Sequence, residues 1–227
     1  MIEFLLLDLD DTVLDFHATE RKSIQRLLQD VEVEPTEELL QRYREINWAH
    51  WRQLERGEIT RDQISHRFDV LFGELGMDVS TPTCEKLFRQ YLSEGDDVLP
   101  GAAEALASLS KKYRIFAASN STIDVQKGRL ARTGLQDYFE DLFVSDAIGA
   151  YKPSPDFFGR AFAAIPGFDP EKAMMVGDSL TSDIQGGLNA GIRTCWINPG
   201  HRPNPTEFQP HYEIEALPQL EALLESL

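Results

Sequence analysis

The chain has 227 residues, and 42% of them are hydrophobic, so it can bury a substantial core as one elaborated domain or as a core with a small insert. Its 38 acidic residues outnumber its 22 basic residues and give a net charge of -16, and Lys and Arg are interleaved with Asp and Glu along the chain. This balance disfavours a nucleic-acid groove or an anionic membrane surface as the partner. An acidic small substrate remains compatible with it if a metal ion and one or two cations reverse the field locally.

The cysteines and the N-terminus predict a cytoplasmic protein with no membrane span. Cys84 and Cys195 are far apart and form no disulfide framework or zinc motif. The apolar run at residues 4–7 is interrupted by Asp8 and has no basic flank, so it is too short for a signal peptide or a membrane span. The sequence leaves the oligomeric state open between monomer and dimer.

The first half of the chain reads as one strand followed by helices. Residues 2–7, which are apolar except for Glu3, predict a buried strand of a parallel sheet that ends at Asp8. From about residue 18 to residue 94, apolar residues recur three and four apart, which predicts helices and no strand. A turn at Pro100 and Gly101 follows, and then a helix over residues 102–111.

The second half alternates strands with helices. The predicted strands are residues 113–118, 142–145, 173–176 and 193–197. This alternation predicts an α/β fold, a Rossmann-like, doubly wound parallel sheet with an inserted all-helical cap. We expect residues 1–14 and 98–227 to form the core and residues 15–97 to form the cap. Residues 201–210, rich in proline, predict an irregular loop before a short C-terminal helix.

Polar residues follow four of the predicted strands, where an open parallel sheet binds its ligand. They are Asp8 and Asp10, Ser119 and Asn120, Lys152, and Asp178 and Asp183. Each group alone is also typical of an ordinary turn, a solvated loop or a helix cap. Their occurrence at four strand ends of one sheet favours a functional site.

These residue types together fit phosphate chemistry. The carboxylates of Asp8, Asp10 and Asp178 would supply hard oxygen ligands to Mg²⁺. Lys152 and the hydroxyl of Ser119 would hold the remaining phosphate oxygens. The set therefore predicts a magnesium-dependent site for a phosphate ester.

The same residues resemble the four motifs of the haloacid dehalogenase superfamily, in the same order. They are the Asp8 and Asp10 pair with Thr12, then Ser119, Lys152 and the GDSLTSD segment at residues 177–183. The resemblance covers nearly the whole chain, the helical insert included. It implies that Asp8 attacks phosphorus to form an aspartyl-phosphate and that Asp10 is the general acid and base.

The resemblance also implies roles for the other residues. Ser119 and Asn120 would bind the transferring phosphoryl group, and Lys152 would neutralise charge on the nucleophile and the phosphate. The metal ligands would be Asp8, Asp178 and Asp10, the last through its backbone carbonyl. Asp183 would orient either a metal-bound water or Lys152. An aspartate at position 10 favours a phosphatase or a phosphomutase over the dehalogenases and transport ATPases of the superfamily.

The insert, the hinge at residues 13–16 and the segment 187–198 resemble the noncanonical pyrimidine 5'-nucleotidase subfamily. This implies nucleoside monophosphates such as UMP, dUMP or dTMP as substrates. A sugar-phosphate or phosphoglycolate phosphatase, a phosphomutase and a non-catalytic binding module are the alternatives; the last would be expected to have lost a motif carboxylate, and none is lost here. Trp48 and Trp51 are expected to pack within the insert, with stacking of one indole on a substrate base as the alternative.

Overall fold

The computed structural model describes residues 1–227, except that residue 55 is described only as part of its helix. Contacts within the chain divide it into two compact units. The first consists of Met1–Phe16 and Asp96–Leu227, and the second of His17–Gly95. We describe each unit by itself.

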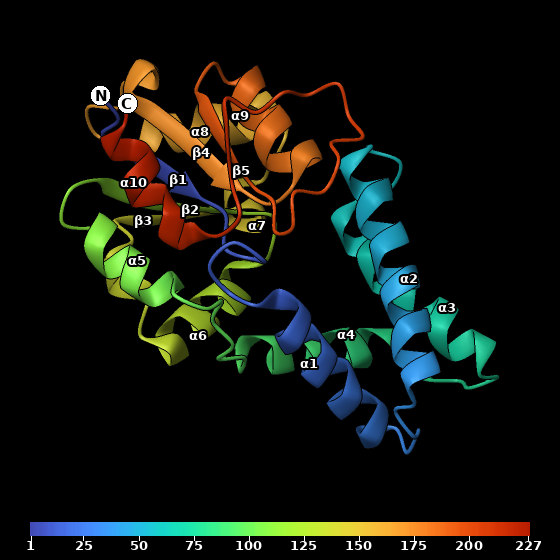
Figure 1. Ribbon diagram of the computed structural model, residues 1–227. Coiled ribbons are helices and arrows are strands. Elements are labelled where there is room, and N and C mark those ends of the chain that lie inside the picture. The colour runs from blue at the N-terminus through green and yellow to red at the C-terminus, as the bar shows by residue number, and fades with distance from the viewer. The chain divides into compact units, whose positions relative to one another are not determined.

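The first unit is built on a six-stranded parallel sheet (Figure 1). Its strands are β1 (Phe4–Leu7), β2 (Arg114–Ser119), β3 (Asp141–Val144), β4 (Ala173–Gly177), β5 (Arg193–Ile197) and β6 (Tyr212–Ile214). The spatial order is β3-β2-β1-β4-β5-β6, and every neighbouring pair is parallel. The strand order therefore reverses direction between β1 and β4, which is where such sheets bind ligands.

Helices cover both faces of this sheet (Figure 1). They are α5 (Ala102–Leu109), α6 (Ile123–Thr133), α7 (Ser145–Ile148), α8 (Pro155–Ala164), α9 (Gln185–Asn189) and α10 (Leu220–Glu225). Because side chains alternate along a strand, Leu5 and Leu7 of β1 pack in the core cluster that contains α5 and α10, whereas Phe4 and Leu6 pack in the cluster that contains α8. The predicted doubly wound parallel sheet is confirmed.

The register of the sheet brings three strand ends together. Leu7 of β1 lies between Ala117 of β2 and Val176 of β4. The residues that follow β1, β2 and β4 therefore emerge side by side at the carboxyl edge. Short segments between the main elements are η2 (Gln136–Tyr138), η3 (Pro170–Lys172), η4 (Leu180–Ile184) and η5 (Leu217–Gln219).

The second unit is helical over the residues that the structure describes, as the spacing of its apolar residues predicts. Its elements are α1 (Phe16–Asp30), α2 (Glu37–Glu55), η1 (Arg61–Ser65), α3 (His66–Glu74) and α4 (Thr81–Ser93). Rings of Tyr43, Phe68 and Phe88 pack against one another in its core. The expectation that Trp48 packs inside is wrong, because its indole is 67% exposed, with the Arg52 guanidinium 5.0 Å from the ring centre.

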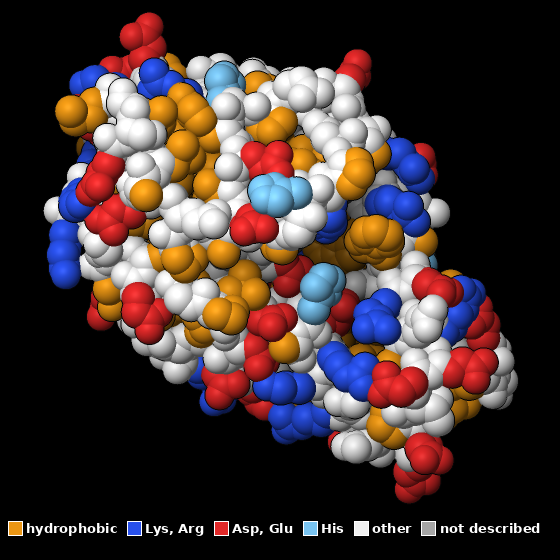
Figure 2. All heavy atoms as spheres, viewed as in Figure 1, with side chains coloured by type: hydrophobic (Ala, Val, Ile, Leu, Met, Phe, Trp, Pro, Cys, Tyr) orange, Lys and Arg blue, Asp and Glu red, His pale blue; other side chains and the backbone are white. Residues whose placement is uncertain are grey.

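The sequence does not predict β6, because a strand of three residues is too short to show alternation. Other boundaries differ by one or two residues, as at the end of α5, which stops at Leu109. On the face shown in Figure 2, Lys and Arg side chains lie among Asp and Glu side chains. No helix in the described part of the chain has the length and apolar character to cross a membrane.

Candidate active site

Asp8 directly follows β1 at the carboxyl edge of the sheet. Its backbone N–H donates to the carbonyl of Val176 at 2.9 Å, so the β1–β4 pairing fixes its position. The chain then turns sharply: Asp11 has φ of 56°, and its carboxylate accepts a hydrogen bond from the Phe16 N–H at 3.1 Å. This turn places Asp8 and Asp10 on a loop whose two ends are both held by hydrogen bonds.

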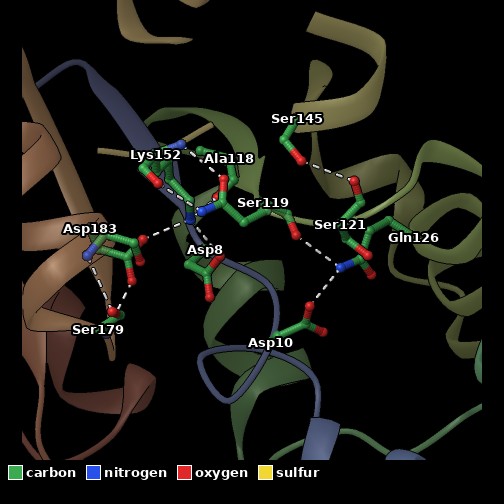
Figure 3. A network of polar contacts seen from close by, with 12 residues as sticks. Asp8, Asp10, Ala118, Ser119, Ser121, Gln126, Ser145, Lys152, Ser179 and Asp183 are labelled. Carbon is green, nitrogen blue, oxygen red and sulfur yellow. Dashed lines mark hydrogen bonds and ion pairs between the residues drawn. The ribbon is translucent and has the colours of Figure 1, made fainter. Parts of the chain in front are cut away.

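Lys152, in the loop between α7 and α8, lies at the centre of the polar network (Figure 3). Its ammonium group donates to Asp8 Oδ1 at 2.7 Å, to Asp183 Oδ1 at 2.6 Å and to the carbonyl of Ala118 at 2.5 Å. The Lys152 side chain is only 1% exposed. A buried cation therefore touches the predicted nucleophile.

The electrostatics of Lys152 and Asp8 follow from burial and from their neighbours. Burial alone would lower the pKa of Lys152, but the charges of Asp183 and Asp8 outweigh it and hold that pKa above its usual value. Burial raises the pKa of Asp8 well above its usual range, although Lys152 opposes the shift. The carboxylates of Asp183, Asp10 and Asp178 raise the pKa of Asp8 further. The site thus holds a permanent cation beside crowded carboxylates.

Three carboxylates form a cluster that can hold a metal ion. Oxygen atoms of Asp8, Asp178 and Asp183 lie within 4.8 Å of one another. Burial, and then the charges of Asp183 and Asp11, raises the pKa of Asp178 well above its usual range. Hard oxygen donors that repel one another in this way fit Mg²⁺, whose charge would stabilise their ionised forms. Both carboxylate oxygens of Asp183 already accept hydrogen bonds, from Lys152 and from the Ser179 N–H, whereas Asp8 accepts from Lys152 through Oδ1 alone, so Asp8 and Asp178 are the side chains better placed to bind the ion.

The crowding of this cluster predicts a stability effect of Asp178→Asn. Since the pKa of Asp178 is higher in the folded than in the unfolded protein, its contribution to stability is complete at low pH and is lost as the pH rises. The metal-free variant should therefore match the wild type near about pH 4 and melt several degrees higher at neutral pH.

Thermal unfolding in EDTA across this pH range, for wild type, Asp178→Asn and the exposed control Asp137→Asn, measures the effect. Adding Mg²⁺ should raise the Tm of the wild type more than that of Asp178→Asn. Equal Tm values of wild type and Asp178→Asn at neutral pH would show that the cluster is not under electrostatic strain.

Asp183 and Asn120 hold Lys152 in place. Asp183 is fully buried, and its second carboxylate oxygen accepts from the Ser179 N–H at 3.1 Å. Asn120 donates from Nδ2 to the Lys152 carbonyl at 2.8 Å and accepts from the Lys152 N–H at 2.9 Å. The Asn120 side chain thus holds the Lys152 loop, and a phosphate contact from Asn120 would use its backbone N–H or the second hydrogen of Nδ2. That contact remains a prediction.

Gly177 at the end of β4 has a steric reason to be glycine. A Cβ atom at this position would collide with the carboxylate of Asp183. The absence of a side chain therefore lets Asp183 approach the end of β4 and reach Lys152.

The side chain of Asp10 points to helix α6 and not to the acidic cluster (Figure 3). One oxygen pairs with Arg129, and the other accepts from Gln126 Nε2 at 2.9 Å. The same Gln126 nitrogen donates to Ser119 Oγ at 2.9 Å. A metal contact through the Asp10 backbone carbonyl stays a prediction.

Sequence reasoning missed Gln126 and Arg129, although a signal for them exists. The buried residues of α6 are Val125, Gln126, Arg129 and Leu130, a stripe with helical spacing. A glutamine and an arginine within an apolar stripe are unusual, because buried polar groups need partners. Their partners here are two of the predicted site residues, Asp10 and Ser119.

Comparisons with known proteins agree with this geometry. A profile of haloacid dehalogenase-like hydrolases matches residues 2–191. The pyrimidine 5'-nucleotidases PynA of Streptococcus pneumoniae and YjjG of Escherichia coli are 39% and 34% identical to the chain. These alignments cover 93% of the chain and 90% of PynA, and 98% of the chain and 97% of YjjG.

A third relative, the HAD-hydrolase YfnB of Bacillus subtilis, is 38% identical over 97% of the chain and 94% of its own length. The crystal structure of YfnB bound to magnesium superposes on this chain with a TM-score of 0.94, and the alignment covers 98% of each chain. The resemblance that the motifs indicate is thereby confirmed. The chain belongs to the haloacid dehalogenase-like hydrolase family.

Proposed function

We propose that this protein is a magnesium-dependent phosphomonoester hydrolase that acts through an aspartyl-phosphate on Asp8, with pyrimidine nucleoside 5'-monophosphates as substrates. The observation that carries the proposal is the buried contact of Lys152 with both Asp8 and Asp183, next to an acidic cluster at the carboxyl edge of the sheet. A carboxylate nucleophile held by a permanent cation is suited to attack a negatively charged phosphate.

In the first step, a carboxylate oxygen of Asp8 attacks phosphorus, and the bond from phosphorus to the ester oxygen breaks. The Asp10 carboxyl group, after it exchanges its contacts with Arg129 and Gln126 for the substrate, gives a proton to the departing oxygen, which leaves as an alcohol. Lys152 stabilises the negative charge of the phosphoryl oxygens, and Ser119 donates a hydrogen bond to one of them. Bound Mg²⁺, held by Asp8, Asp178 and the Asp10 carbonyl, would neutralise further charge on the phosphate.

In the second step, Asp10 takes a proton from a water molecule as that water attacks phosphorus. The bond between phosphorus and Asp8 breaks, which releases inorganic phosphate and restores the Asp8 carboxylate. Asp183 keeps Lys152 in place through both steps, since Lys152 has contacts with both carboxylates.

The substrate class rests on the two relatives named as pyrimidine 5'-nucleotidases, which match the chain over nearly its full length. We further propose that residues 1–14 and 98–227 carry the chemistry and that residues 15–97 act as a cap that sets substrate choice. Both cysteines are buried and free, which supports the cytoplasm as the site of action. A sugar-phosphate or phosphoglycolate phosphatase is the second candidate.

A substrate panel with Mg²⁺ tests the proposal. We expect kcat/KM for UMP, dUMP and dTMP to exceed that for AMP, glucose 6-phosphate and phosphoglycolate by at least about tenfold, a ratio that pocket contacts readily supply. Excess EDTA should abolish phosphate release, and added Mg²⁺ should restore it.

The panel separates the parts of the proposal. Preference for phosphoglycolate or a hexose phosphate would contradict the nucleotidase assignment and leave the phosphatase assignment intact. Isomerisation of a sugar phosphate with little release of phosphate would indicate a phosphomutase. Full activity in EDTA would contradict the magnesium requirement.

A further inference from the structure

The network on α6 determines which way the hydrogen bonds between Arg129, Gln126 and Ser119 run. A guanidinium group can only donate, so Arg129 Nη1, 3.4 Å from Gln126 Oε1, marks that atom as the amide oxygen. Asp10 lies 2.9 Å from the opposite atom, Nε2, and its carboxylate accepts there. Both neighbours therefore fix the same orientation of the Gln126 amide.

This orientation decides the role of the Ser119 hydroxyl. Nε2 of Gln126 is 2.9 Å from Ser119 Oγ and has only hydrogens to offer, so Ser119 must accept this bond. The hydroxyl hydrogen of Ser119 is then left for another acceptor. Ser119 is fully buried, and in the part of the chain that the structure describes its hydroxyl donates to no protein atom.

The burial of the network shows that it is built into the core. Gln126 is 0% exposed and the side chain of Arg129 is 1% exposed. Nε and Nη2 of Arg129 have no hydrogen-bond partner among the described residues. The guanidinium contacts Asp10 and Gln126, and it lies 5.8 Å from the centre of the Phe16 ring. An arginine buried with donors left over adds little to stability, which favours a functional reason for its place.

We propose that Gln126 is a positioning residue that keeps the Ser119 hydroxyl as a hydrogen-bond donor toward the phosphoryl group, with Arg129 and Asp10 fixing its amide. This deepens the proposed function and rests on it for the identity of the ligand. A serine that could also rotate to donate to the protein would offer its hydrogen to phosphate only part of the time. By donating to Ser119, Gln126 occupies a lone pair of Oγ and so restricts the directions in which the hydroxyl hydrogen can point.

The test is a double-mutant cycle between Gln126→Met and Ser119→Ala, because methionine keeps the length of the side chain but cannot donate. In the wild-type background, Gln126→Met should weaken binding of inorganic phosphate with Mg²⁺, measured by calorimetry, by about three- to tenfold. In the Ser119→Ala background, the same substitution should change binding by less than about twofold. Phosphate binding is the readout, because Gln126→Met also removes the hydrogen bond to Asp10, whose proton transfer affects the kcat of ester hydrolysis.

Val125→Ala is the matched control, because Val125 is the buried neighbour of Gln126 on the same helix. Any loss that Val125→Ala causes through packing should be the same with and without Ser119. Thermal unfolding of every variant identifies a loss that follows from partial unfolding.

The outcomes separate this inference from the proposed function. If Gln126→Met causes equal losses in both backgrounds, or no loss in either, the positioning role is overturned. The proposal that the protein is a phosphatase would not be affected by that result. If the two substitutions are non-additive in phosphate binding but the wild type hydrolyses no ester, the positioning role is supported and the proposed function is overturned. A wild type that binds no phosphate and hydrolyses no ester would overturn both.

Discussion

The Asp8→Asn variant is expected to lose ester hydrolysis by at least about 10⁴-fold while it keeps its fold, as enzymes do when a covalent nucleophile is removed. An amide is a far weaker nucleophile than a carboxylate, and Asp8 is the carboxylate that Lys152 contacts at 2.7 Å. The fold should survive, because the pKa of Asp8 is raised by burial, so a neutral side chain fits this position well.

Two measurements check this result. Steady-state kinetics with the best ester of the panel gives the loss of kcat/KM, and circular dichroism with thermal unfolding reports on the fold. Rapid acid quench followed by peptide mass spectrometry should find a hydroxylamine-sensitive phosphoryl adduct on Asp8 in the wild type. Asp137→Asn, at an exposed position, is the control and should behave as the wild type does.

If Asp8 were only a metal ligand and not the nucleophile, the kinetic and mass-spectrometric results would differ. In that case Asp8→Asn would regain turnover at high Mg²⁺ concentration, and no adduct would form on the wild-type peptide. Either finding would contradict the covalent mechanism.

Lys152→Met should cost both activity and stability. Without the ammonium group, charge on the phosphoryl oxygens is uncompensated, and kcat should fall on the order of 10³-fold. The substitution also leaves the buried carboxylates of Asp8 and Asp183 without their cation, and loss of one partner of a buried ion pair costs about 3–5 kcal/mol of unfolding free energy.

A double variant separates the two losses. In Lys152→Met with Asp183→Asn, one charge of each sign is removed, so much of the unfolding free energy should return, as urea denaturation would show. The kcat should stay low, because the cation beside Asp8 is still missing. Recovery of activity together with stability would mean that Lys152 supports the fold only and has no part in the chemistry.

The strand ends of the site could be predicted from the sequence for a physical reason. Buried parallel strands are continuous apolar runs, so the first polar residue after the run, such as Asp8 or Asp178, marks the edge of the sheet. Because carboxyl ends of neighbouring strands meet at one edge, residues from distant parts of the chain could be assigned to one site before their contacts were known.

The contacts themselves could not be predicted in the same way. Gln126 and Arg129 lie on a helix, and their partnership with Asp10 depends on how α6 packs on the sheet, which no local pattern encodes. Asn120 shows the converse case, since its place after a strand predicts phosphate binding, yet its side chain holds the backbone of Lys152. The sequence identifies chemical groups, whereas tertiary packing decides which partners satisfy them.

The central place of β1 has a consequence for how the molecule is made. Both neighbours of β1 are synthesised much later than β1 itself, since Leu7 pairs with Ala117 and with Val176. Before β2 and β4 have been synthesised, the nascent chain contains a fully apolar strand whose two edges have no hydrogen-bonding partner. Such edges promote aggregation until β2 and β4 pair with β1. The order of translation is thus not the order of assembly, and a ribosome-bound chain that stops before β4 should depend on chaperones and have no catalytic centre.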